Sequence, residues 1–183
     1  DQRENRKAAA AYMQDLSVLD VCCYSGGFAL AASKLGGARE VLGIDTAQRA
    51  VALARANAEL NGIKNVRFET GDAFKTIQAF NVEGRKFGAV VLDPPKFAAN
   101  RQALPDALRA YERLNVGAIN LLEMGGILVT CSCTGGVSRE DFTYILAEAA
   151  ARTRRPLQIL ETRGAAPDHP FSASCLETEY LKC

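Results

Sequence analysis

The sequence predicts a doubly wound, Rossmann-like α/β domain built on a mostly parallel sheet. An apolar run, a glycine turn and a helical segment follow one another at residues 18–35. A second apolar run, at 41–45, ends in Asp45, and a later one, at 87–92, is followed by Asp93. Because the carboxyl ends of parallel strands meet along one edge of a sheet, these polar strand ends predict a shared ligand pocket.

The first strand, turn and helix are the segment around which the rest is organised. Residues 18–21, Val-Leu-Asp-Val, form an apolar run with one acid, which is typical of a buried parallel strand. The glycines of the turn at 25–27 allow a ligand to approach the backbone closely, and helical residues follow at 28–35. The turn lacks the G-x-G-x-x-G pattern of dinucleotide sites. Asp45 could accept hydrogen bonds from both hydroxyls of a ribose, or it could be a solvated acid at a strand end.

The remaining chain alternates between helical and extended patterns. Residues 1–14 are polar and alanine-rich, which indicates an entry loop and a short helix. Ser138-x-x-Asp141 resembles a capping box, and Pro105 is suited to the first turn of a helix. Further helices are expected at 47–60, 73–80, 105–123 and 139–151, and further strands at 66–69, 127–131, 157–160 and 179–182.

Composition limits the class of protein. The 183 residues are 48% hydrophobic and 23% charged, which suits one globular domain, and the net charge of +1 gives no overall attraction to nucleic acid or acidic membranes. No apolar run approaches the ~20 residues of a membrane span, and no signal-peptide pattern is present. The chain begins at Asp1 without an initiator Met, so we expect it to be part of a longer protein.

The six cysteines show no C-x-x-C spacing, so no metal site is expected. Several lie in apolar strands, where a thiol behaves as a small hydrophobe, and a reducing cytoplasm is the expected compartment. The alternative is a metal site that joins Cys22 and Cys23 to Cys131 and Cys133.

The order of the polar motifs resembles that of class I S-adenosylmethionine-dependent methyltransferases. The matching motifs are D-V-C-C-Y-S-G-G-F at 20–28, G-I-D at 43–45, G-D-A-F at 71–74 and D-P-P-K-F at 93–97. Together with these, D-Q-R-E-N-R at 1–6, S-C-T-G-G at 132–136 and D-H-P at 168–170 resemble the cytosine-C5 methyltransferases of large-subunit ribosomal RNA.

This resemblance covers residues 1–181 and carries expectations about architecture. It implies a seven-stranded, mostly parallel sheet with one antiparallel strand. It also implies that residues 1–183 form a catalytic domain whose N-terminal RNA-binding domain lies outside the chain. That would account for the low net charge, because the surface that grips phosphates would lie elsewhere.

The resemblance also assigns S-adenosylmethionine as the cofactor and suggests its ligands. The backbone of the turn would hold the methionine part, Asp45 the ribose, and residues after the third strand the adenine. The residues concerned are Tyr24, Ser25, Gly26, Gly27, Phe28, Asp45, Asp72, Ala73, Phe74 and Asp93. The turn departs from many class I members in having fewer glycines.

Methylation at carbon 5 of cytosine requires activation, because that carbon is a poor nucleophile. A thiolate that adds to carbon 6 makes carbon 5 nucleophilic. Cys131 and Cys133 are the candidates, and the glycines at 135–136 indicate that the strand ends near Ser132, which leaves Cys133 in a loop and Cys131 in the sheet. The resemblance also aligns Cys133 with the family's nucleophile. The alternative for either residue is a buried structural thiol.

Other polar residues have two interpretations each. Asp93 could hydrogen-bond N3 and the amino group of cytosine, or it could cap a turn. Lys96 could contact phosphate or lower the pKa of a thiol, although a solvated lysine is the simpler interpretation. His169 could stabilise a turn or take part in catalysis. Arg3 and Arg6 could contact the cofactor or the target base.

The predicted partner is ribosomal RNA with an unpaired or flipped-out cytosine, because a stacked base cannot enter such a pocket. Three alternatives remain: a methyltransferase acting on an exocyclic amine or ring nitrogen of RNA, a small-molecule methyltransferase, and a cofactor-binding scaffold. The sequence leaves open which nucleotide is modified and whether the protein forms a homodimer.

Overall fold

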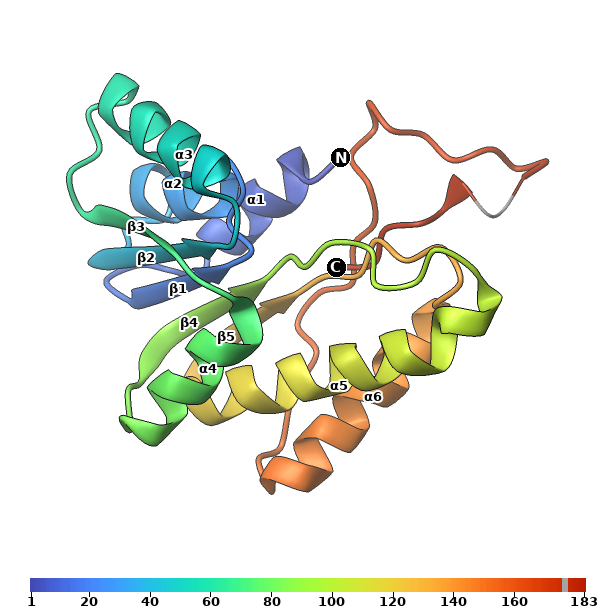
Figure 1. The fold of residues 1–183 in the computed structure, drawn as a ribbon. Helices are drawn as coiled ribbons and strands as arrows, with labels where there is room; N and C mark the ends of the chain where they lie inside the picture. Colours follow the sequence, from blue (N-terminus) through green and yellow to red (C-terminus); the bar gives the residue numbers. More distant parts are fainter. Residues whose placement is uncertain (176–177) are drawn as a thin grey trace.

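The computed structural model describes residues 1–175 and 178–183. Its sheet is parallel throughout and has the strand order β3-β2-β1-β4-β5 (Figure 1). The strands are β1 (Ser17–Val21), β2 (Glu40–Asp45), β3 (Val66–Thr70), β4 (Phe87–Leu92) and β5 (Leu122–Thr130). The order reverses beside β1, so the doubly wound prediction is confirmed, and a ligand site is expected at the carboxyl ends of β1 and β4.

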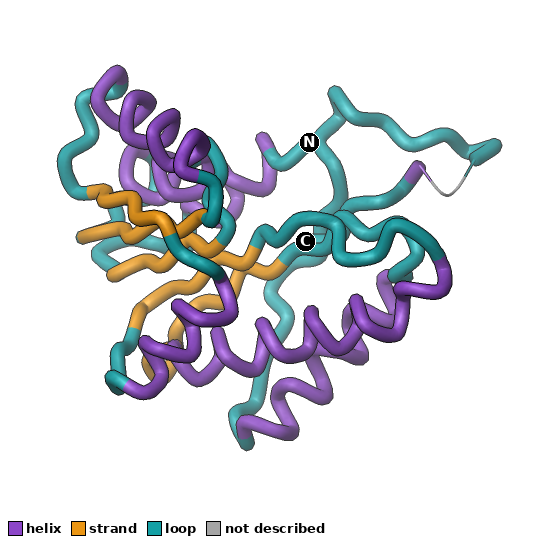
Figure 2. Tube along the Cα trace, viewed as in Figure 1, coloured by secondary structure: helices purple, strands orange, loops and turns teal. Residues whose placement is uncertain are grey.

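Helices cover both faces of the sheet (Figures 1 and 2). On one face lie α1 (Arg3–Ala10), α2 (Gly27–Lys34) and α3 (Gln48–Leu60). On the other lie α4 (Ala73–Val82) and α5 (Leu104–Leu121), with α6 (Arg139–Thr153) packed against α5. A 3-10 turn, Arg101–Ala103, precedes α5.

The strands bury alternate residues in two cores, as the two-residue period of a strand requires. Val18 of β1 packs with the side chains of α1, α2 and α3, whereas Leu19 packs with those of α4 and α5. All five residues of β1 and all six of β4 are buried. The capping box is also confirmed, since Ser138 and Asp141 exchange hydrogen bonds at the start of α6.

The prediction of seven strands with one antiparallel member is wrong for the described residues, which form five strands, all parallel. Residues 157–160 are irregular, with Ile159 and Leu160 about 60% exposed, because no neighbouring backbone pairs with them. Residues 179–182 contribute only an antiparallel bridge between Ser132 and Lys182. Apolar composition favours a strand, but a strand needs a partner edge.

The start of β5 also differs from expectation. The predicted helix at 105–123 and the predicted strand at 127–131 leave a break at residues 124–126, yet α5 runs directly into β5 at Leu122. The two glycines lie within β5, opposite a register shift between Phe87 and Ala89 of β4, and Gly125 has φ +75°. At these two positions glycine permits an irregularity within a strand and does not form a loop. No helix in the described part of the chain is long and apolar enough to cross a membrane.

Candidate functional site

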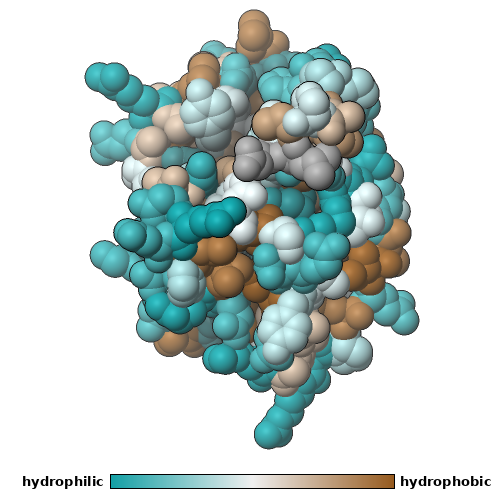
Figure 3. Space-filling view, turned by 90° about the vertical axis from the view of Figure 1, so that its right-hand side faces the viewer, coloured by the Kyte–Doolittle hydropathy of each residue, from teal (hydrophilic) through white to brown (hydrophobic). Residues whose placement is uncertain are grey.

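A cavity of about 370 Å³ lies at the carboxyl ends of the central strands. It brings together four of the predicted site residues, Tyr24, Asp45, Ala73 and Asp93. The remaining lining residues are Cys22, Ile44, Thr46, Gly71 and Pro95. Figure 3 views the molecule from the side to which β4 and β5 point, where hydrophobic residues near the middle are bordered by hydrophilic ones.

The turn after β1 is held in an unusual backbone conformation. Cys22 and Tyr24 have positive φ values of 63° and 48° although neither is glycine. A positive φ at a residue other than glycine costs free energy, and residues in this conformation cluster at ligand sites. The N–H of Tyr24 donates to Oδ2 of Asp45 over 2.9 Å, and Oδ1 of Asp45 accepts from Ala47 N–H over 2.9 Å. The carboxylate of Asp45 is therefore fixed at the cavity, with lone pairs left for a further donor.

The other residues of the predicted turn form its base. Gly26 has φ +84°, and a Cβ there would lie 2.7 Å from Cζ of Phe68, so the close approach requires glycine. The carbonyl of Ser25 accepts from Nδ2 of Asn57 over 3.0 Å, and Phe28 is buried in the core. Of the predicted residues from 24 to 28, only Tyr24 lines the cavity.

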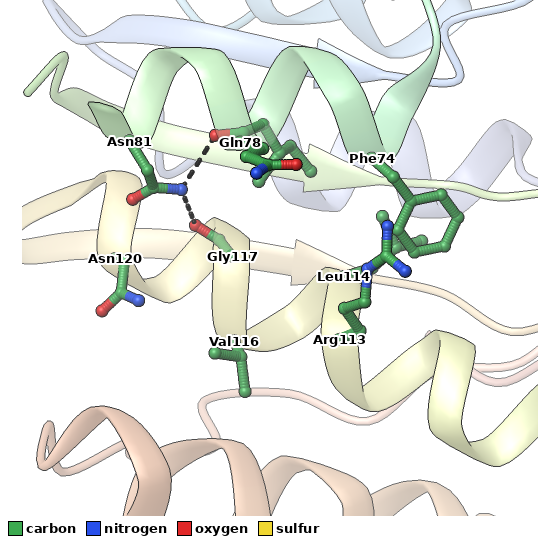
Figure 4. A pocket seen from close by; sticks show the side chains of 9 residues that line it. Phe74, Gln78, Asn81, Arg113, Leu114, Val116, Gly117 and Asn120 are labelled. Carbon is green, nitrogen blue, oxygen red and sulfur yellow. Dashed lines mark hydrogen bonds between the residues drawn. The ribbon is translucent and has the colours of Figure 1, made fainter. Parts of the chain in front are cut away.

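Asp72 and Phe74 lie apart from this cavity lining. Asp72 is exposed and caps α4 by accepting from Lys75 N–H over 2.9 Å. Phe74 lines a second cavity, of about 400 Å³, between α4 and α5. There the guanidinium of Arg113 lies 4.3 Å from the centre of the Phe74 ring (Figure 4). Among the residues predicted to surround adenine, the structure places Ala73 alone in the first cavity.

Asp93 follows β4 and is held by Gln2, the residue before α1. Its Oδ1 accepts from Nε2 of Gln2 over 2.8 Å, and Gln2 in turn accepts from Asn5 Nδ2. Burial raises the pKa of Asp93, while the hydrogen bond from Gln2 and the charge of Arg6 oppose that rise. A carboxyl group in such a setting can carry a proton more readily than an exposed one.

Cys133 lies beside Asp93, in a loop that is anchored on both sides. Its Sγ is 3.8 Å from the carbonyl oxygen of Pro94, as a weak donor. Ser132 exchanges two backbone hydrogen bonds with Lys182, and Oγ1 of Thr134 bonds the hydroxyl of Tyr111 over 2.8 Å. Both neighbours are buried and Cys133 is partly exposed. The loop therefore presents one thiol in a fixed position.

The other thiols near the sheet have different environments. Cys131 is 1% exposed and belongs to the core, as the sequence predicted. Cys22 lines the cavity, but burial raises its pKa to about 12, so it stays protonated. Among the described residues, no group of three or more His, Cys, Asp or Glu side chains could hold a metal ion.

Lys182 is a functional candidate that the sequence did not reveal. It is 4% exposed, and its Nζ donates to the carbonyls of Thr134 and Tyr180, each over 2.8 Å. Burial lowers the pKa of Lys182 to about 8. Burial and the charge of Asp93 raise the pKa of Cys133, whereas the cations Lys182 and Lys96 lower it.

Asp20 is a second such candidate, in the middle of β1. It is 0% exposed, its Oδ2 accepts from Ala29 N–H over 2.9 Å, and its buried Oδ1 has no partner among the described residues. Burial raises the pKa of Asp20 to about 8. The signal in the sequence was an acidic residue inside a buried apolar strand, because burying a carboxyl group there costs free energy of folding.

Replacing Asp20 by Asn should flatten the dependence of stability on pH. A carboxyl group whose pKa is raised on folding stabilises most below its unfolded pKa, and that contribution is lost as pH rises through the folded value of about 8. The wild-type free energy of unfolding should therefore fall by up to about 1.4 kcal/mol per pH unit more than that of Asp20→Asn between about pH 4 and 8. Urea unfolding at several pH values measures both slopes, and parallel curves would contradict the prediction.

Arg3 and His169 lie on the surface. Nη2 of Arg3 is 3.3 Å from Oδ2 of Asp168, and Nδ1 of His169 is 3.2 Å from Oδ1 of the same residue. Neither side chain lines the cavity, and their contacts are those of an exposed ion pair.

The chain is similar to several known proteins. It is 45% identical over its whole length to the ribosomal RNA large subunit methyltransferase I of Aeromonas hydrophila, of which it covers 46%. The structure of SMU.776, a provisionally assigned methyltransferase complexed with SAH, has a TM-score of 0.87 at 21% identity and covers all of this chain and 48% of its own. A SAM-dependent methyltransferase from Agrobacterium tumefaciens has a TM-score of 0.67 at 25% identity, covering 81% of this chain and 49% of its own.

These likenesses concern a part of longer proteins, since the chain spans about half the length of the curated relatives it matches. The structural neighbour at 21% identity supports the α/β fold with its parallel sheet. A family model described as a methyltransferase domain matches residues 13–164, which include the turn after β1, the strand ends and the loop of Cys133. The chain therefore belongs to the methyltransferase-domain family.

Proposed function

We propose that this chain transfers the methyl group of S-adenosylmethionine to carbon 5 of a cytosine in ribosomal RNA. The observation that carries the proposal is the partly exposed thiol of Cys133, held beside Asp93 at the carboxyl end of the sheet. The name of the 45% identical relative supports an RNA substrate of the large ribosomal subunit. In this proposal residues 1–183 are the catalytic domain, and an RNA-binding domain lies in another part of the protein.

The residues around the cavity fit the cofactor. The strained turn at Cys22 and Tyr24, the fixed carboxylate of Asp45 and the cavity of about 370 Å³ supply a backbone cradle, a ribose acceptor and space. The unpartnered Oδ1 of Asp20 and Nε of Arg6 lie next to the same turn, where polar groups of a ligand would satisfy them. S-adenosylmethionine supplies an electrophilic methyl group bound to a sulfonium.

Cys133 acts as the nucleophile on the base. Its thiolate adds to carbon 6 of cytosine, the carbon 5–carbon 6 double bond is broken, and carbon 5 becomes nucleophilic. Carbon 5 would then form a bond to the methyl group as the sulfur–methyl bond breaks, with a neutral thioether as the leaving group. A base then removes the proton from carbon 5, the double bond re-forms and the carbon–sulfur bond breaks to release the thiolate. The anchored loop keeps Sγ in place through both steps, which lowers the entropic cost of reaching the base.

Asp93 holds the polar edge of the base in this proposal. When protonated, its carboxyl group can donate to N3 of cytosine while accepting from the amino group, which withdraws electrons from carbon 6. Its raised pKa favours that protonated form. Gln2, which donates to Oδ1, fixes the orientation of the carboxyl group.

The acceptor is an unpaired or flipped-out cytosine, because only a base outside a helix can reach a thiol at the edge of the sheet. A test is methyl transfer by the protein to ribosomal RNA from a strain that lacks its gene, followed by fragmentation of the modified nucleoside. Methyl label on carbon 5 supports the proposal. Label on an exocyclic amine or a ring nitrogen would favour the alternative of nitrogen methylation instead. In that reaction Cys133 has no catalytic role.

Asp45→Ala should weaken cofactor binding without unfolding the protein. The substitution removes acceptors for the ribose hydroxyls, each worth at most about 1.5–3 kcal/mol because the acceptor is charged. Calorimetry with S-adenosylmethionine measures the loss. Asp15→Ala is a matched control, since this exposed acid lies before β1 and outside the cavity lining. Unchanged affinity in Asp45→Ala would place the ribose elsewhere.

Lys182→Met should make Cys133 less reactive at neutral pH. The buried ammonium lies behind the loop, so its removal takes away a charge that favours the thiolate. We expect several-fold slower alkylation of Cys133 by iodoacetamide at pH 7.5, with Lys182→Arg retaining most of the wild-type rate. The pH profile of alkylation, with the labelled cysteine identified by mass spectrometry, is the measurement. A profile that does not move would show that Lys182 only supports the backbone.

A further inference from the structure

The guanidinium of Arg6 is an unsatisfied cation at the start of α2. Arg6 belongs to α1, is partly buried, and lies over Gly27, where a Cβ would collide with it. Its Cζ is 5.8 Å from the centre of the Phe28 ring. The buried Nε has no hydrogen-bond partner among the described residues. Glycine at position 27 thus makes room for a cation against the first turn of the helix.

Two acids lie near Arg6, and neither bonds to it. Asp93 uses Oδ1 to accept from Gln2, and Asp20 uses Oδ2 to accept from Ala29 N–H. No ion pair within 4 Å joins Arg6 to an acid in the described part of the chain. A buried N–H donor without an acceptor, such as Nε of Arg6, is costly. The group is therefore poised for an anion that the chain itself does not provide.

The turn and α2 define what kind of anion fits. The first N–H groups of a helix favour negative charge, and Arg6 lies over that first turn. Asp20 accepts from Ala29 N–H in the same turn and keeps a buried Oδ1 without a partner, so positive and negative groups of a ligand would both find partners. This combination suits a zwitterion such as an α-amino acid better than a simple anion.

We propose that Arg6 binds the carboxylate of the methionine part of S-adenosylmethionine. The inference rests on the proposed function and extends it by naming the residue that recognises one group of the cofactor. Arg6 then selects ligands with an intact amino-acid end, while the unpartnered Oδ1 of Asp20 can accept from the ammonium. The alternative is that Arg6 contacts a phosphate of the RNA, but its position against Gly27 and over the ring of Phe28 places it beside the cofactor turn.

Decarboxylated S-adenosylmethionine provides the test, because it lacks the carboxylate and keeps the sulfonium, the amine and the nucleoside. Calorimetry should show that the wild-type protein binds S-adenosylmethionine about tenfold to a hundredfold more tightly than the decarboxylated compound. In Arg6→Met this ratio should fall towards one, through loss of affinity for the intact cofactor alone. Arg6→Lys should recover part of it, and Arg3→Met, an exposed arginine on the same helix, should leave it unchanged.

A second variant tests the same point without removing the arginine. Gly27→Ala places a Cβ where the guanidinium lies and should also reduce the ratio. Thermal unfolding checks that each variant is folded. An equal loss of affinity for both compounds, or an unchanged ratio with weaker RNA binding, would overturn the assignment of Arg6. Equal binding of both compounds by the wild-type protein would overturn the assignment too. Binding of neither compound would contradict the proposed function as well as the assignment.

Discussion

Replacing Cys133 by alanine should abolish methyl transfer to RNA and leave the affinity for S-adenosylmethionine nearly intact. The thiol lies in a loop held by Ser132 and Thr134, so its removal takes away the nucleophile and leaves the loop anchored. Without addition at carbon 6, carbon 5 of cytosine has no route to nucleophilic character. Single-turnover transfer of labelled methyl groups and calorimetry with the cofactor measure the two effects.

Cys131→Ser is the matched control, two residues away. It places a hydroxyl in the packed core and should cost stability, about 1–3 kcal/mol, while chemistry is largely retained. Wild-type protein should also form a denaturant-resistant adduct with 5-fluorocytosine RNA, because fluorine cannot leave carbon 5 as a proton does. Methylation that survives in Cys133→Ala, or an adduct that maps to Cys131, would transfer the role to another residue.

The parts of the fold that could be predicted are those whose signal is local. The run at 18–21, the glycines of the turn and the helical residues after it specify β1, the turn and α2 without any partner. The capping box at Ser138 is likewise local, because its hydrogen bonds join residues three apart. Such patterns can be recognised in a sequence since the interactions that satisfy them lie within a few residues.

The parts that could not be predicted depend on distant partners. Residues 157–160 have strand composition, but a strand forms only where it pairs with a neighbour, and these residues join no ladder of the sheet that the described residues form. The glycines at 125–126 lie between the predicted helix and the predicted strand, whereas the pairing of β5 with β4 includes them as an irregularity. Tertiary pairing overrode local preference in both segments.

The candidate site divides in the same way. Tyr24, Asp45 and Asp93 follow strands, so topology alone brings them to one cavity. The position of the Phe74 side chain depends on the orientation of α4, and it turns towards α5 and Arg113 instead of the cavity. Lys182 could not be connected with Cys133 from sequence, because only the bridge between Ser132 and Lys182 brings the C-terminal segment to the loop.

The rate of methyl transfer should depend on pH with two limbs, and the falling limb should belong to Asp93. The proposed reaction needs Cys133 as a thiolate and Asp93 with its proton. Burial raises both pKa values, and the Asp93 charge contributes to the rise for Cys133. As pH rises, the thiolate fraction grows, whereas the protonated fraction of Asp93 falls through its raised pKa, so kcat should pass through a maximum.

Asp93→Asn separates the two limbs. An amide can accept from the amino group of cytosine and donate to N3, but it cannot transfer a proton, so kcat should fall by about 10²-fold, the lower end of what general acid catalysis contributes. The remaining activity should rise with pH and then level off, because of the two groups that act on the base only Cys133 still titrates. Asp106→Asn, which alters an exposed acid in the first turn of α5 outside the cavity lining, should keep the wild-type maximum. A falling limb that persists in Asp93→Asn would assign the required proton to another group.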